Sequence, residues 1–234
     1  MLLLRRSAFV LVVMTSSCSR SGSPTEDQPP SRAAKAPATT EAVNAATAPA
    51  AISKAELGMP APDFSLPDLD GHTVKLSDHL GKLVVLEWFN PGCPFVNKTH
   101  TVGQLKELAK HEMAKGVVWL AVNSAAPGKQ GYGVEANRAG KAHFNLTHPI
   151  LLDESGAVGH AYGALHTPHL FVIDTKGVLV YAGAIDNSPD GEGESPTGGQ
   201  LVNYVEQALG DVRAGKPVRT PRTEAYGCGV KYGA

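Results

Sequence analysis

The sequence lacks several features that mark other classes of protein. Its 234 residues carry 21 Lys and Arg against 22 Asp and Glu, with no basic block, so the charge pattern does not favour binding to nucleic acid. Beyond the N-terminal segment no apolar run is long enough to span a membrane, and no internal repeat is found. With 42% hydrophobic residues, the chain can bury the core of one ordinary domain plus appendages.

Residues 1–18 have the layout of a secretory signal. Arg5 and Arg6 precede an apolar stretch at residues 8–14, and small polar residues follow. The segment also resembles a bacterial lipoprotein signal that ends at Cys18, although Thr15 stands where such signals usually carry leucine. Two outcomes stay open for an exported protein: Cys18 is lipidated and tethers it to a membrane, or the signal is cleaved and the protein is released into the periplasm.

Residues 19–56 predict a disordered tether. They consist largely of Ser, Pro, Thr and Ala, with almost no large apolar side chain, so burial cannot offset the entropy lost on ordering. The domain is expected at residues 57–215, followed by a C-terminal tail at residues 216–234.

Cysteine is scarce, and this makes each one informative. Because Cys18 belongs to the export signal, only Cys93 and Cys228 remain for an oxidising compartment, which indicates at most one internal bridge. Cys93 follows an apolar run and opens a helical pattern. A thiol at that place meets the positive end of the helix dipole, which favours the nucleophilic thiolate, whereas the alternative is a buried, inert cysteine.

The spacing of apolar residues predicts an α/β domain with a mixed sheet. We expect an N-terminal hairpin around Asp70 and Gly71, and a C-terminal hairpin across residues 174–177. Buried strands are expected at residues 83–89, 117–122, 150–152, 170–173 and 179–182. Helices are expected at residues 96–115, 134–144, 156–162 and 198–214.

This order of elements resembles the thioredoxin superfamily, and specifically the redoxin branch related to alkyl hydroperoxide reductase and thiol-specific antioxidant proteins. The opening Ala-Pro-Asp-Phe-Ser-Leu at residues 61–66, the active-site segment at residues 88–96 and Thr167-Pro168 before residues 171–174 carry the resemblance. It implies a three-layer fold, a cis Pro168, and redox chemistry at Cys93 without an organic cofactor.

A narrower resemblance links the chain to a poorly characterised exported redoxin subgroup. It rests on residues 86–96, 123–130 and 226–232, and members likewise carry an active-site cysteine and a tail cysteine. Two features depart from better-known relatives. Val96 replaces the second cysteine of Cys-x-x-Cys, and Leu86 and Asn90 stand where peroxiredoxins carry Pro and Thr.

The role of Cys228 has two interpretations. A docked tail could bring it to Cys93 as the resolving thiol, or the bridge could be structural and stabilise the fold by about 4 to 5 kcal/mol in the chain-entropy model. The resemblance also implies that Thr167, Pro168 and Pro94 bind substrate, since a backbone edge beside the active-site sulfur can pair with an extended chain.

Glu87 lies on an otherwise apolar strand, where a lone carboxylate is costly unless it titrates or is paired. Thioredoxins carry an aspartate at the matching place that assists proton transfer, and a hydrogen-bonded structural carboxylate is the alternative. His166 and His169 flank Thr167-Pro168. With Cys93 they could form a copper or zinc site, or His169 could hold Cys93 as thiolate by its charge.

These observations together predict an exported thiol-disulfide oxidoreductase, in which Cys93 attacks and Cys228 resolves. The partner would be a thiol or disulfide protein or a small oxidant, and the attack requires an exposed sulfur. The alternatives are a peroxiredoxin-like thiol peroxidase, and a non-catalytic module with a structural disulfide or a Cys/His copper site.

Overall fold

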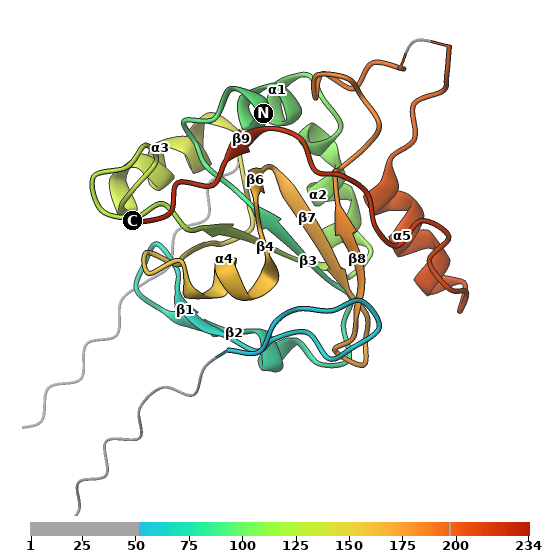
Figure 1. Ribbon diagram of the computed structural model, residues 1–234, viewed down its shortest axis with the longest axis horizontal. Coiled ribbons are helices and arrows are strands. Elements are labelled where there is room, and N and C mark those ends of the chain that lie inside the picture. The colour runs from blue at the N-terminus through green and yellow to red at the C-terminus, as the bar shows by residue number, and fades with distance from the viewer. Residues whose placement is uncertain (1–51, 197) are drawn as a thin grey trace, which may run out of the picture. The chain divides into compact units, whose positions relative to one another are not determined.

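A computed structural model describes residues 52–196 and 198–234 (Figure 1). The expected export signal, Cys18 and most of the expected tether lie outside the described residues. Ordered packing begins earlier than the expected domain start, because Ile52 and Ala55 pack against a buried cluster. In the described part of the chain, no helix combines the length and apolar composition needed to cross a bilayer.

A five-stranded mixed sheet forms the centre of the fold. Its strands, in spatial order, are β5 (Ile150–Leu152), β4 (Val118–Asn123), β3 (Val84–Trp88), β7 (His169–Ile173) and β8 (Leu179–Gly183). The β3, β4 and β5 strands are parallel, whereas β7 runs antiparallel to both β3 and β8. The predicted strands and the C-terminal hairpin are confirmed.

Helices and a hairpin cover both faces of this sheet. The helices are α1 (Pro94–Thr101), α2 (Leu105–Ala114), α3 (Val134–His143), α4 (Ala157–Tyr162) and α5 (Tyr204–Arg213). One buried cluster joins α4 to one face, and a second joins α2 and α5 to the other (Figure 1). The predicted three-layer α/β architecture is therefore confirmed.

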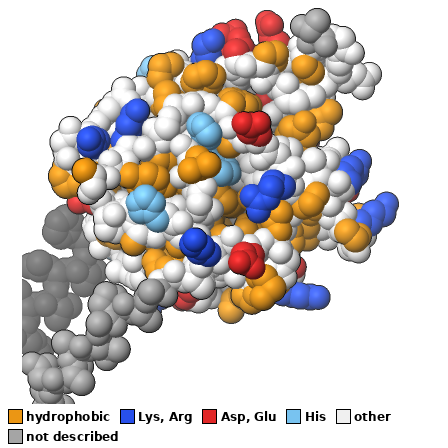
Figure 2. Space-filling model, viewed as in Figure 1, with side chains coloured by type: hydrophobic (Ala, Val, Ile, Leu, Met, Phe, Trp, Pro, Cys, Tyr) orange, Lys and Arg blue, Asp and Glu red, His pale blue; other side chains and the backbone are white. Residues whose placement is uncertain are grey.

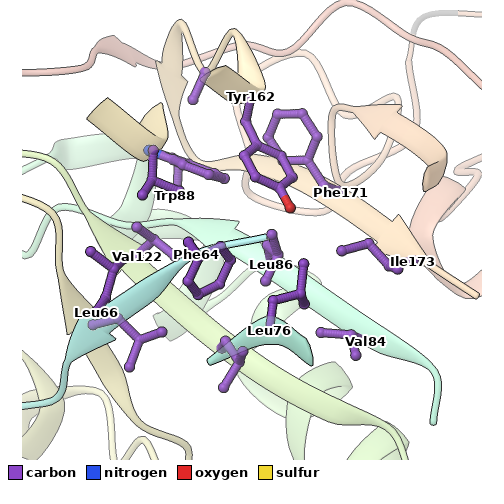
Figure 3. Packing of buried hydrophobic residues seen from close by; sticks show 14 of the residues in the cluster. Phe64, Leu66, Leu76, Val84, Leu86, Trp88, Val122, Tyr162, Phe171 and Ile173 are labelled. Atoms are coloured by element: carbon purple, nitrogen blue, oxygen red, sulfur yellow. The ribbon is translucent and has the colours of Figure 1, made fainter. Parts of the chain in front are cut away.

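The N-terminal hairpin completes the layer that contains α4. Strands β1 (Ser65–Pro67) and β2 (Thr73–Lys75) pair antiparallel, and the short 3-10 helix η1 (Leu76–His79) follows. Figure 3 shows Phe64 of this region near the rings of Trp88 and Tyr162, and Leu66 on the side of Val122. The Trp88 ring lies 5.4 Å from that of Tyr162 and 5.1 Å from that of Phe171, so aromatic packing anchors the end of β3 that leads to Cys93.

The single helix expected at residues 96–115 is wrong, because the chain forms α1 and α2 with a break between them. A β-carbon on Gly103 would lie within van der Waals overlap of the Gly191 carbonyl, so the chain needs glycine at this close approach. The helix expected at residues 198–214 begins only at Tyr204. There the Asn203 side chain accepts from the Glu206 amide and caps the helix.

The C-terminal tail returns across the top of the sheet and forms a strand that the sequence pattern does not predict (Figure 1). Strand β9 (Cys228–Gly229) pairs antiparallel with β6 (His166–Thr167). Charged side chains of both signs are interspersed on the face that carries this tail (Figure 2). Because β9 pairs with β6, the tail lies on the domain as part of the fold.

Candidate active site

Cys93 lies where the central strand β3 passes into α1. It is the N-cap residue of α1, and Pro94 occupies the first turn, where its missing N–H removes no helical hydrogen bond. The preceding loop is held by Asn90, whose Oδ1 accepts from the Gly92 amide at 2.9 Å and whose Nδ2 donates to the Gln130 carbonyl at 2.9 Å. These contacts place the sulfur at the positive end of the helix.

Three segments far apart in the sequence meet at the Cys93 sulfur. Its thiol donates to the Thr167 carbonyl at 3.1 Å, and the Thr167–Pro168 peptide bond is cis, as the resemblance implies. Thr167 is the strand partner of Cys228 across β6 and β9. The structure thus brings Cys93, Thr167 and Cys228 together, with both cysteines as free thiols.

The expectation of an exposed Cys93 sulfur is wrong for this conformation. Cys93 is 1% exposed and packs with Phe89, Val96 and the half-buried Cys228. Thr167 and Pro168 are also buried, whereas Pro94 is exposed. The burial of Cys93 arises from core residues of the sheet and of α1, together with Cys228 of the tail, which packs against the same cluster.

The two thiols have opposite pKa shifts. Burial alone raises the pKa of Cys93, but hydrogen bonds from the side chains of Cys228 and Thr167 and from the Val96 backbone outweigh it, so the pKa lies below its usual value. Burial, together with the adjacent Cys93, raises the pKa of Cys228 to about 11. When one proton leaves the pair, the thiolate therefore forms on Cys93.

This asymmetry predicts a pH dependence for alkylation. The rate of iodoacetamide modification at Cys93 is expected to rise to half its plateau at a pH below 9.0, the ordinary value, because only the thiolate reacts. Modification of Cys228 is expected to follow a titration near pH 11. Mass spectrometry of peptides from timed reactions separates the two sites. A midpoint for Cys93 at or above 9.0 contradicts the assignment.

Glu87 is fully buried and has two hydrogen-bond partners. The His100 Nε2–H donates to Oε1 at 2.7 Å, and the Trp119 Nε1–H donates to Oε2 at 3.0 Å. Burial works to raise the pKa of Glu87, but the His100 charge and hydrogen bond, His148 and Trp119 together hold it below its usual value. Both oxygens are occupied, and neither is bonded to Cys93.

His100 is a site residue that the sequence analysis missed. It lies seven residues after Cys93, two turns along α1, and therefore faces the sheet on the same side of the helix. That spacing, combined with a carboxylate on the preceding strand, is the sequence signal that identifies the pair. The contact joins α1 to β3 directly behind the cysteine.

His166 and His169 do not converge on Cys93. The His169 Nδ1 accepts from the Leu165 amide at 3.4 Å, and its ring lies 4.4 Å from that of Phe171. Burial, with the charges of His166 and Arg222, lowers the pKa of His169 to about 4, so a neutral ring cannot hold a thiolate by charge at pH 7. Within the described residues, the close groups of potential metal ligands are Asp68–Asp70–His72 and His111–Glu112–Glu206, and neither includes these residues.

Residues 56–201 match the model of the Redoxin family, more than half of the chain. The chain belongs to the Redoxin family. The thiol-disulfide oxidoreductase ResA of Geobacillus thermodenitrificans is 34% identical over 128 residues, which cover 52% of this chain and 65% of that protein. Peroxiredoxin-2 of Bos taurus is 33% identical over 140 residues, which cover 56% of this chain and 69% of that protein. The match to ResA thus spans slightly less than two thirds of its length.

Solved structures resemble this redoxin over more of the chain. A hypothetical protein of Sinorhizobium meliloti has a TM-score of 0.66 and 29% identity, covering 78% of this chain and 98% of that one. An uncharacterised conserved protein of Geobacillus kaustophilus has a TM-score of 0.64 and 30% identity, covering 76% and 93%. The predicted redoxin-type, thioredoxin-like fold is confirmed.

Proposed function

We propose that this redoxin is an exported thiol-disulfide oxidoreductase in which Cys93 is the nucleophile and Cys228 the resolving thiol. The observation that carries the proposal is the pairing of Cys228 with Thr167, whose carbonyl accepts from the Cys93 thiol. A second thiol beside the nucleophile serves as the resolving thiol, the role that the second cysteine of Cys-x-x-Cys has in thioredoxins and that Val96 cannot fill here. The similarity to ResA supports the same chemistry.

The proposed exchange has two steps. The Cys93 thiolate attacks one sulfur of a partner disulfide, so that a Cys93–partner bond forms, the partner S–S bond breaks, and the other partner sulfur leaves as a thiolate that takes up a proton. The Cys228 thiolate then attacks the Cys93 sulfur and releases the second partner thiol. The partner disulfide gains two electrons, and Cys93 and Cys228 form a disulfide that a dithiol reductant reopens.

Glu87 is proposed to hold α1 on β3 rather than to exchange protons with Cys93. Its oxygens accept from His100 and Trp119, which leaves no bonded route to the sulfur. A buried carboxylate with two donors is satisfied, and this agrees with the structural alternative for the residue.

Disulfide exchange is favoured over peroxide reduction by the surroundings of the sulfur. Leu86 is a buried core residue, and the Asn90 side chain is committed to Gly92 and Gln130, so neither takes the part that Pro and Thr have in the peroxiredoxin signature. Export, by lipidated Cys18 or by release, rests on the N-terminal sequence.

The proposal is tested with Ellman's reagent, a small aromatic disulfide that releases a coloured thiol. The reduced protein is expected to release two equivalents of thiol and to keep no adduct, since Cys228 displaces the second one. Cys228→Ser is expected to release one equivalent and to carry a single adduct on Cys93 by mass spectrometry. If Cys228→Ser still forms an adduct-free oxidised product, Cys228 is not the resolving thiol.

A further inference from the structure

The segment Tyr226–Tyr232, here called the strap, occupies the backbone edge of β6 beside the nucleophile (Figure 1). Cys228 pairs with Thr167 and Gly229 with His166. Beyond the strand, the Val230 amide donates to the Leu165 carbonyl at 3.1 Å, and the Lys231 carbonyl accepts from the Ala126 amide at 2.9 Å. The edge that an extended partner chain needs is therefore already filled by the protein's own backbone.

Two tyrosines fasten the strap on either side of Cys228. The Tyr226 hydroxyl donates to the Asp186 carboxylate at 2.8 Å, and its ring lies 6.2 Å from that of Phe95. The Tyr232 hydroxyl donates to the Ala164 carbonyl at 2.8 Å, and its ring stacks on His160 at 4.0 Å. Because both anchors use side chains, the strength of docking can be changed without altering either cysteine.

Gly227 sets how closely the strap approaches. Its φ is +122°, and a β-carbon there would overlap the Thr167 carbonyl oxygen and lie 3.4 Å from the ring of Pro168. A β-carbon on Gly229, on the other side of Cys228, would meet no atom within 4 Å. Of the two glycines, only the one that precedes the cysteine is therefore required for the chain to pair here.

The resemblance already implies that this backbone edge, here called the strip, pairs with an extended substrate. We propose that the strap is the resident competitor for the strip, and that a partner which replaces it carries a cysteine preceded by glycine. The inference rests on the proposed function and adds the class of partner to it. A partner that pairs in the register of the strap places its cysteine at the position of Cys228, next to Cys93, and its preceding residue in the space of Gly227.

The strap must consequently meet two opposed demands. It leaves the strip so that Cys93 can attack the partner disulfide, and it returns so that Cys228 can resolve the mixed disulfide. A change that weakens docking is expected to speed the first step and to slow the second. A change that merely perturbs folding does not produce this opposite pair of effects.

The decisive comparison is Gly227→Ala against its matched control Gly229→Ala in the full chain. The probe is a symmetric disulfide of a short Gly-Cys-Gly-Val peptide, and quenched samples are analysed by mass spectrometry. Gly227→Ala is expected to form the Cys93–peptide adduct at least tenfold faster and to resolve it at least tenfold slower, whereas Gly229→Ala matches the unaltered protein. Tyr226→Phe is expected to shift both steps in the same directions by a few-fold, with Tyr132→Phe, whose hydroxyl bonds Glu154 at the surface, as its control.

A second arm tests the partner class. In the Gly227→Ala protein, whose strip is open, the Gly-Cys-Gly-Val disulfide is expected to react at least fivefold faster than the Ala-Cys-Gly-Val disulfide. Equal behaviour of Gly227→Ala and Gly229→Ala, or equal rates for the two peptides, overturns the inference while leaving the proposed function intact. Absence of a Cys93 adduct in every variant, with Ellman's reagent as well as with peptide, instead defeats the proposed function.

Discussion

Cys93→Ser is expected to lose disulfide exchange down to the uncatalysed background. A serine hydroxyl cannot form a disulfide, so the attack loses its nucleophilic sulfur and the resolution loses the sulfur that Cys228 attacks. The half-buried Cys228 remains, but burial, the largest cause of its raised pKa, persists without Cys93 and disfavours the Cys228 thiolate at pH 7. The measurement is the amount and rate of thiol released from Ellman's reagent by the reduced protein.

Folding of this variant provides the control. The substitution replaces one small side chain that donates to the Thr167 carbonyl by another, so the free energy of unfolding is expected to change by about 1 kcal/mol or less. Cys228→Ser, which keeps the nucleophile, should retain the first step. A Cys93→Ser protein that folds normally and still consumes disulfide at the original rate places the chemistry elsewhere in the molecule.

Glu87→Ala is expected to cost about 3 to 5 kcal/mol in the free energy of unfolding, since it removes one partner from a buried, charge-assisted network. The donors of His100 and Trp119 then lie in the core without acceptors. Loss of the contact also frees α1, which carries Cys93, from β3. Urea unfolding at pH 7, followed by tryptophan fluorescence, measures the change.

Glu87→Gln is the matched control, because its amide oxygen still accepts one hydrogen bond at nearly the same volume. Its expected cost is smaller, about 1 to 2 kcal/mol. The folded-state pKa of Glu87 is lowered, so its charge stabilises the fold above the unfolded-state value, near 4.5, and this contribution is lost as the pH falls through the lower folded value. The difference between the unaltered protein and Glu87→Gln should therefore shrink in acid. A loss below about 1 kcal/mol for Glu87→Ala at pH 7 contradicts the structural role.

Local patterns were sufficient to predict the position of Cys93. A run of apolar residues ending near Phe89, then Pro94 and a helical period, can only place the cysteine where a buried strand enters a helix. The same patterns predict both hairpins and the strands of the sheet, because period and turn residues are local properties. The helix boundaries were less predictable. At the break between α1 and α2, Gly103 closely approaches the Gly191 carbonyl, which is distant in sequence.

The sequence by itself determined that this protein has one thiol at a helix start, a second thiol in a tail, and an α/β domain between them. Only the tertiary structure decided that Glu87 is paired with His100 and Trp119, that β9 lies on β6, and that Cys228 packs beside Cys93. The physical reason is that the spacing of apolar residues determines helices and strands locally, whereas these contacts join residues far apart in the chain. The backbone edge of β6, the close approach at Gly227 and the buried acceptor oxygens of Glu87 exist only once the chain has folded.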